Sequence, residues 1–163
     1  MNNVTIKKAS IKDGNYLSVE YTEFKPDGIS KFNQDCKIPV HTDLKTAFAE
    51  LDIHLANMSF QRDKKGKIDT DTISCKGFSI GGNGESEGVT LTGIRTLESD
   101  KTLNISSPFQ RFDGDFFEYK QMDELIDALD KCKFEVMAYL FDGKHEEDNQ
   151  MSIPFEELEE AQA

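Results

Sequence analysis

Lysines and aromatic rings alternate along the first forty residues in a pattern that suits single-stranded nucleic acid, and further cations follow at 62–67. Cationic side chains can follow the phosphates of a single strand while exposed rings stack on its bases. We therefore predict a nucleic-acid-binding surface made of Lys7, Lys8, Lys12, Tyr16, Tyr21, Lys31, Lys64, Lys65 and Lys67. The alternative is that the rings fill the core while the lysines coat the surface, because stacking requires exposed rings.

No pattern of reactive residues indicates catalysis or metal binding. His41, His54 and His145 are scattered without metal-ligand spacing, and no local signature marks a nucleophilic serine or cysteine. The glycine-rich segment 81–88 lacks the Lys-Ser/Thr pair of a phosphate loop and contains two glutamates that would repel phosphate. We expect a protein that is not an enzyme and that uses no metal or cofactor.

The composition favours a globular protein of the cytoplasm. The 163 residues are 37% hydrophobic and include twelve phenylalanines, enough for one core. The chain has no apolar run of membrane-spanning length, and its first residues lack the apolar region of a signal peptide. Cys36, Cys75 and Cys132 lie far apart with no C-x-x-C pair, which is typical of reduced, mostly buried thiols.

The formal net charge of −12 is unevenly distributed along the chain. Residues 1–80 contain 12 basic and 11 acidic side chains, whereas residues 81–163 contain 7 and 20. The ending from Asp142 onward contributes eight of these acids against a single lysine. We predict one domain over residues 1–141, followed by an acidic, flexible tail over residues 142–163.

One short apolar segment interrupts this acidic ending: Gln150-Met151-Ser152-Ile153-Pro154-Phe155. The segment resembles the hexapeptide with which bacterial proteins bind the sliding clamp. That resemblance implies that Gln150 enters a polar subsite while Ile153 and Phe155 enter an apolar one. Acids followed by Ile-Pro-Phe are also similar to the tail of bacterial single-stranded DNA-binding proteins, although here eight residues follow the phenylalanine.

An extended peptide with two apolar anchors and a stiffening proline can bind small pockets on a partner protein. We predict that Gln150, Met151, Ile153 and Phe155 bind a host replication protein such as the sliding clamp. The alternative is that Ile153 and Phe155 fold back onto the body, because exposed apolar side chains are usually covered.

Alternating strands followed by a helix occur twice along the chain. Segments 4–11 and 16–24 alternate with period two, and further strands are predicted at 30–40, 72–80, 89–97 and 102–112. Apolar positions on one helical face run from Leu44 to Met58 and again from Met122 to Leu140. We predict an α+β fold with mostly antiparallel sheets and two helices, in duplicated β-β-β-α halves over residues 1–60 and 71–141.

Four runs carry a resemblance that extends over most of the chain: residues 38–48, 77–82, 85–93 and 103–109. They resemble an uncharacterised protein family of tailed phages and prophages. Such proteins often accompany replication and recombination genes, and the resemblance implies that the protein acts in the host bacterial cytoplasm.

These patterns together predict a non-enzymatic phage accessory protein of DNA replication or recombination. It would bind single-stranded DNA and recruit a host replication protein through its tail. One alternative is an acidic inhibitor of a host defence or DNA-binding protein that presents carboxylates as phosphate mimics, with Glu118, Asp123, Glu124, Asp127 and Asp130. Another is a clamp-like ring subunit, a homo-oligomer lined by positive charge.

Overall fold

The computed structural model describes residues 3–113 and 119–146 of the chain. Its first half contains β1 (Val4–Lys12), β2 (Tyr16–Lys25), β3 (Gly28–Asp35), α1 (Thr42–Ala49) and α2 (Asp52–Met58). Its second half contains β4 (Ile73–Gly81), the short 3₁₀ helix η1 (Gly84–Ser86), β5 (Gly88–Thr96), β6 (Thr102–Ser106), β7 (Gln110–Arg111) and α3 (Met122–Asp142).

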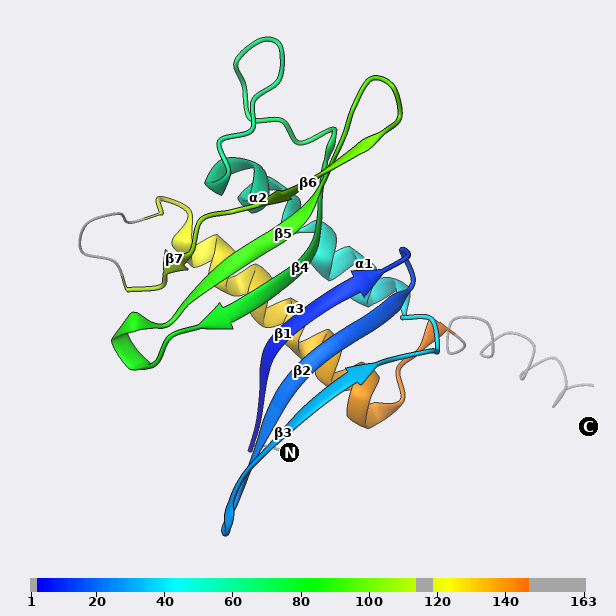
Figure 1. The fold of residues 1–163 in the computed structure, drawn as a ribbon, viewed down its shortest axis with the longest axis vertical. Helices are drawn as coiled ribbons and strands as arrows, with labels where there is room; N and C mark the ends of the chain where they lie inside the picture. The colour runs from blue at the N-terminus through cyan, green and yellow to red at the C-terminus, as the bar shows by residue number, and fades with distance from the viewer. Residues whose placement is uncertain (1–2, 114–118, 147–163) are drawn as a thin grey trace, which may run out of the picture.

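All strands join one antiparallel sheet in the order β3-β2-β1-β4-β5-β6, and β7 also pairs with β5. The helices lie on one side of this sheet, behind it in Figure 1, so that the other side is left open. The predicted α+β class with an antiparallel sheet is therefore confirmed. β1 and β4 pair with each other, so the strands of the two halves join in a single sheet.

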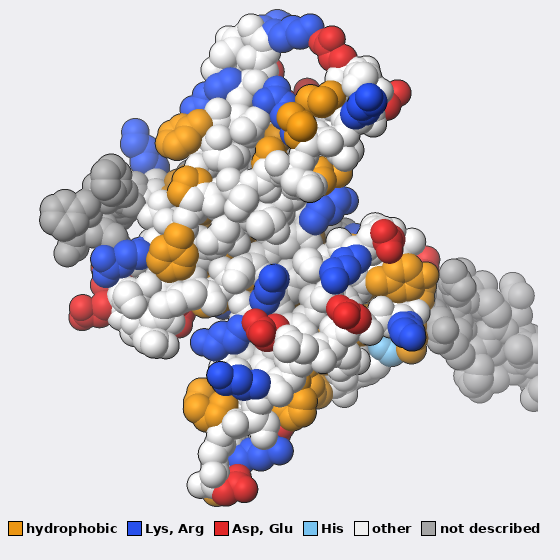
Figure 2. Space-filling model, in the orientation of Figure 1, with side chains coloured by type: hydrophobic (Ala, Val, Ile, Leu, Met, Phe, Trp, Pro, Cys, Tyr) orange, Lys and Arg blue, Asp and Glu red, His pale blue; other side chains and the backbone are white. Residues whose placement is uncertain are grey.

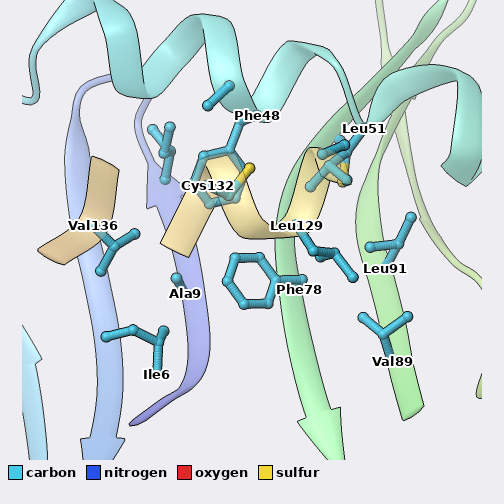
Figure 3. Packing of buried hydrophobic residues seen from close by; sticks show 14 of the residues in the cluster. Ile6, Ala9, Phe48, Leu51, Phe78, Val89, Leu91, Leu129, Cys132 and Val136 are labelled. Atoms are coloured by element: carbon cyan, nitrogen blue, oxygen red, sulfur yellow. The ribbon is translucent and has the colours of Figure 1, made fainter. Parts of the chain in front are cut away.

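The core lies between the sheet and the helices, as Figure 3 shows. Alternate strand residues face it because successive side chains of a strand point to opposite sides. In β1 these residues are Ile6, Ala9 and Ile11, whose order is shifted once by a bulge between Ile6 and Lys8. Phe48 of α1 stacks on Phe78 of β4, with ring centroids 5.9 Å apart. In β1, β2, β4 and β5 the buried face therefore follows the sequence alternation, apart from the bulges in β1 and β4.

The predicted first helix is divided into α1 and α2 near Leu51. The backbone N–H of Leu51 donates to the carbonyl of Phe48, three residues earlier, which tightens the chain there into a 3₁₀ turn. Beyond this turn, Asp52 accepts a hydrogen bond from the backbone N–H of Cys75 at 2.6 Å and ties α2 to β4. As a result α1 packs against α3, while α2 packs against β4 and β5.

The residues directly after α3 belong to the body, so the tail begins later than predicted. Gly143 ends the helix in the left-handed conformation, with φ of 69°, that glycine adopts readily. Lys144 then forms an ion pair with Asp43 of α1 at 2.8 Å, and His145 forms a β-bridge with Val40. Residues 142–146, which were predicted as the start of the tail, are therefore part of the folded body.

None of the described helices is long and apolar enough to span a bilayer.

Candidate nucleic-acid interface

The open side of the sheet carries a row of small polar residues that crosses six strands. The register places these residues side by side in the order Asp35, Ser18, Ser10, Gly77, Thr92 and Ser106. Gly77 sits where a Cβ atom would come within 2.8 Å of the Cβ of Ser10. The centre of the open face therefore carries short side chains, most of which are hydroxyl groups.

Three of the predicted lysines stand on this open face. Lys8 lies in the adjacent row between Glu20 and Ser79, Lys12 pairs with Tyr16, and Lys31 pairs with Thr22. Figure 2 views the molecule from this side and shows Lys and Arg side chains beside a broad area that is neither charged nor hydrophobic, with Asp and Glu side chains between them. The structure thus brings Lys8, Lys12 and Lys31 onto one surface.

Two shallow hollows mark the open face. One, of about 280 Å³, is lined by side chains that include Lys8, Ser10 and Glu20 over β1–β3. The other, of about 410 Å³, is lined by side chains that include Lys76 and Thr92 over β4–β6. Lys76 lies at the bulge of β4 and was not among the predicted residues. Its place in a strand of alternating polarity is a signal that could have identified it.

Charge is separated between the two sides of the molecule. The open face combines Lys8, Lys12, Lys31 and Lys76 with two acids, Glu20 and Asp35, which gives a balance of +2. Helix α3 on the other side contains six acidic and two basic side chains, a balance of −4. A polyanion would therefore meet less repulsion on the sheet side than on the helix side.

Asp35 is held as a carboxylate on the open face. A hydrogen bond from the Ser18 hydroxyl, at 2.7 Å, and the ammonium of Lys12, 3.7 Å away, lower the pKa of this carboxyl. Asp35 thus partly neutralises Lys12. Since both side chains are exposed, a phosphate could displace this surface ion pair at small energetic expense.

The aromatic part of the predicted site needs a correction at Tyr21. Its ring is only 9% exposed, stacks on Phe32 with centroids 4.9 Å apart and meets Phe141 edge-on. Tyr21 shares its strand face with Leu17 and Val19, so that it points into the core and cannot stack on a base. The alternative interpretation, that aromatic rings fill the core, is right for this residue.

Two rings of β2 do remain available on the open side, at opposite ends of the strand. Tyr16 is 37% exposed and pairs with Lys12, whereas Phe24 is exposed beside its cross-strand neighbour Ile29. A ring next to a lysine is the combination that single-stranded nucleic acid requires. Of the predicted tyrosines, Tyr16 alone satisfies this requirement.

Three of the remaining predicted lysines do not join this surface. Lys64, Lys65 and Lys67 lie in the loop after α2, which is fixed by Asp63 and by contacts of Arg95 at the end of β5. Lys64 also pairs with Glu98 in the β5–β6 turn. This loop and β3 lie at opposite ends of the molecule (Figure 1). Lys7, at the bulge of β1, is half-buried.

The cysteines and one of the three histidines are buried. The three cysteines are free and buried, as predicted, and burial raises the pKa of the Cys75 thiol to about 12. His54 is also buried, and its Nδ1 atom lies 2.8 Å from the hydroxyl of Tyr119. Within residues 3–113 and 119–146, no group of three His, Cys, Asp or Glu side chains is placed to hold a metal ion.

The predicted partner-binding residues Gln150, Met151, Ile153 and Phe155 lie outside the described residues. Comparisons with protein-family models, curated proteins and solved structures find no match to this chain. The candidate site is therefore defined by its own geometry, with Lys8, Lys12, Lys31, Lys76 and Tyr16 at its centre.

Proposed function

We propose that this protein is a non-enzymatic accessory factor of phage DNA replication or recombination that binds single-stranded DNA on the open face of its sheet. The observation that carries the proposal is the separation of charge. In a chain of net charge −12, the open face holds four lysines and only two acids. These residues surround a row of short, mostly hydroxyl side chains. Lysines would follow the phosphates, and Tyr16 would stack on a base.

The acidic tail has two roles in this proposal. Its segment Gln150–Phe155 recruits a host replication protein, and its carboxylates compete with DNA for the open-face lysines. Because His145 is bridged to Val40, which follows β3, the tail leaves the body near Asp35 and Lys12. Its starting point is thus on the β3 side of the sheet.

A titration of a labelled single-stranded oligonucleotide, followed by fluorescence anisotropy, tests the proposal. The full chain should bind more weakly as salt rises, and a chain ending at Glu146 should bind more tightly. The triple substitution Lys8→Gln, Lys12→Gln and Lys31→Gln removes up to three phosphate contacts. It should lower the slope of log K against log salt by about 2.

The loop lysines provide a control of equal charge. Lys64→Gln, Lys65→Gln and Lys67→Gln change the net charge by the same amount, but at the opposite end of the molecule. We expect this variant to retain most of the affinity. Equal losses in the two triple variants would mean that DNA senses only overall charge, and absence of binding by every form would reject the proposal.

One observation favours the alternative of an acidic inhibitor. Asp123, Asp127 and Asp130 follow one face of α3 at spacings of four and three residues, and they are exposed together with Glu124. Glu118 lies outside the described residues. A row of carboxylates on a helix can present charge to a DNA-binding protein in place of phosphates. The ring-subunit alternative gains no such support, because the lysines lie on the sheet side and the helices are acidic.

The same oligonucleotide titration distinguishes the two functions. A phosphate mimic should bind no DNA at any salt concentration, and it should instead release DNA from a host nucleic-acid-binding protein. Asp123→Asn, Asp127→Asn and Asp130→Asn should abolish that release. If the triple variant bound DNA as the full chain does and still displaced DNA from the host protein, the helix would not be the mimic.

A further inference from the structure

A cleft of about 790 Å³ lies at the edge of the sheet near β6 and β7. Its apolar side chains are Met58 at the end of α2, Phe60 two residues later, and Pro108 and Phe109 between β6 and β7. Two cations, Arg62 and Lys120, also line it. Three segments that are distant in the sequence thus converge on an apolar cleft that carries positive charge.

Phe60 and Phe109 are unusually exposed for phenylalanines of a folded domain. Phe60 is 75% exposed and Phe109 is 49% exposed. Phe60 occupies the left-handed position that follows α2, with φ of 57°, where glycine is the common residue. The backbone N–H of Phe60 donates to the carbonyl of Asn57, and the N–H of Gln61 donates to the carbonyl of Ala56. These bonds fix the turn that carries the exposed ring. The exposed ring is therefore held in place by backbone hydrogen bonds.

Three polar side chains of the cleft, Asn57, Tyr119 and Gln121, form hydrogen bonds with one another. Asn57 donates through Nδ2 to the Tyr119 hydroxyl at 3.3 Å and to Oε1 of Gln121 at 3.2 Å. The Tyr119 hydroxyl also lies 2.8 Å from Nδ1 of His54. This network fixes the wall of the cleft and leaves its apolar rings and two cations to receive a ligand.

We propose that the cleft binds the segment Ile153–Phe155 of a second copy of this chain. Ile153 and Phe155 supply two apolar anchors for the rings and Met58, and Pro154 limits the entropy lost on ordering. In the sequence, acidic residues flank the segment on both sides, at 146–148 and 156–157. Their charge is opposite to that of Arg62 and Lys120 in the cleft. Charge and apolar pattern therefore agree between the cleft and the tail.

The reach of the chain requires a second copy. The N–H of Glu146 donates to the carbonyl of Pro39, so the tail starts near the end of α3, whereas Tyr119 and Gln121 place the cleft at its beginning (Figure 1). The 21 residues of α3 span roughly 30 Å at about 1.5 Å per residue. Seven residues from Glu146 to Ile153 extend at most about 25 Å. Ile153 therefore cannot enter the cleft of its own chain.

Docking between copies would regulate the availability of the tail. The contact is heterologous, since the cleft of one copy receives the tail of the next, and it can form a closed ring or an open chain. A tail held in this way cannot bind another protein. A replication partner would have to compete for Ile153 and Phe155, so that self-association and recruitment exclude each other. The inference concerns the tail and does not depend on DNA binding.

Two full-length variants that each lack one half of the contact test this proposal. Phe60→Asn removes the ring from the cleft and suits the left-handed position, because asparagine adopts that conformation readily. Phe155→Ala removes one anchor of the tail. In sedimentation velocity without DNA, the wild-type protein should associate as its concentration rises, while each variant alone should sediment as an 18.4 kDa monomer.

An equimolar mixture of the two variants should regain one contact, because one supplies the tail and the other supplies the cleft. The weight-average mass should then rise toward twice that of the monomer. Phe134→Ala is the matched control, since Phe134 is an exposed phenylalanine in the middle of α3 and outside the cleft. This variant should associate as the wild-type protein does.

Three results would overturn the proposal: a wild-type protein that stays monomeric, association that persists in Phe155→Ala, or a mixture that stays monomeric. An oligonucleotide titration identifies the other candidate occupant of the cleft. If Phe60→Asn lost DNA binding while Phe155→Ala associated normally, the cleft would bind nucleic acid and not the tail. Failure of self-association leaves the open-face proposal intact, because the two readouts are separate.

Discussion

The two faces of the sheet use alternate residues of the same strands for different purposes. The covered face carries Ile11, Leu17 and Phe78, which are buried against the helices, whereas the open face carries Ser10, Ser18 and Ser79. Burial of apolar surface stabilises a fold by about 25 cal/mol per Å². The covered face should therefore determine stability, and the open face is free to vary its charge for binding.

A cavity on the covered face should produce the largest effect. Phe78→Ala removes a ring that is almost wholly buried and stacked on Phe48, and we expect a loss of about 3–5 kcal/mol in the free energy of unfolding. Ser79→Ala, the next residue and on the open face, should change it by about 0.5 kcal/mol or less. Urea unfolding followed by circular dichroism measures both. Similar losses in the two variants would contradict the division between the faces.

The same glycine substitution on each face should give a smaller difference. A Cβ atom at Gly93 would come within 2.1 Å of the Ser74 carbonyl oxygen and 2.7 Å of Leu55 in α2. At Gly77 the nearest atom would be the Ser10 Cβ, 2.8 Å away on the open face. We expect Gly93→Ala to reduce the free energy of unfolding by about 1–3 kcal/mol. Gly77→Ala should reduce it less, and thermal unfolding of the two variants will show whether that order holds.

The helix side should also make stability depend on pH through His54. Burial lowers the pKa of His54, and the nearby carboxylate of Glu124 only partly offsets this. The unfolded chain takes up a proton near pH 6.5, whereas the folded chain stays neutral to lower pH. The free energy of unfolding should therefore fall as the pH decreases below about 6.5 and should not change through this group above it.

His54→Gln separates this contribution from those of other groups, since glutamine can still meet the Tyr119 hydroxyl. Urea midpoints between pH 5 and 7 should slope less in this variant than in the wild-type protein. An unchanged slope would mean that His54 is protonated as easily in the folded chain as in the unfolded one, and that water reaches this part of the helix side.

The smallest effect on stability is expected for the open-face lysines. Among residues 3–113 and 119–146, Lys8→Gln, Lys12→Gln and Lys31→Gln together remove one exposed ion pair, that of Lys12 with Asp35. The free energy of unfolding should change by about 0.5 kcal/mol or less. Differential scanning calorimetry measures this change, and a large loss would show that the open face supports the fold as well as any ligand. A loss of DNA binding without a loss of stability would show that the open face serves binding while the covered face serves the fold.

The sequence by itself determined the local elements and which residues they bury. Period-two alternation predicts the strands, and the same alternation places Tyr21 with Leu17 and Val19 on the buried face, although ring type alone suggests a stacking residue. The helical period predicts both helical regions, but not the turn at Leu51, after which the Asp52 carboxylate accepts a hydrogen bond from the backbone N–H of Cys75 in β4. Periodicity is a property of neighbours in the chain, so it can be read without the fold.

Only the tertiary structure decided which of these elements lie together. The pairing of β1 with β4 joins two three-stranded units into one sheet and aligns a polar row across six strands. Long-range packing separates the loop lysines from Lys8, Lys12 and Lys31, and it assembles the edge cleft from three distant segments. Such contacts depend on strand register and on the direction in which the chain turns back. Both are determined jointly by residues that are far apart in the sequence.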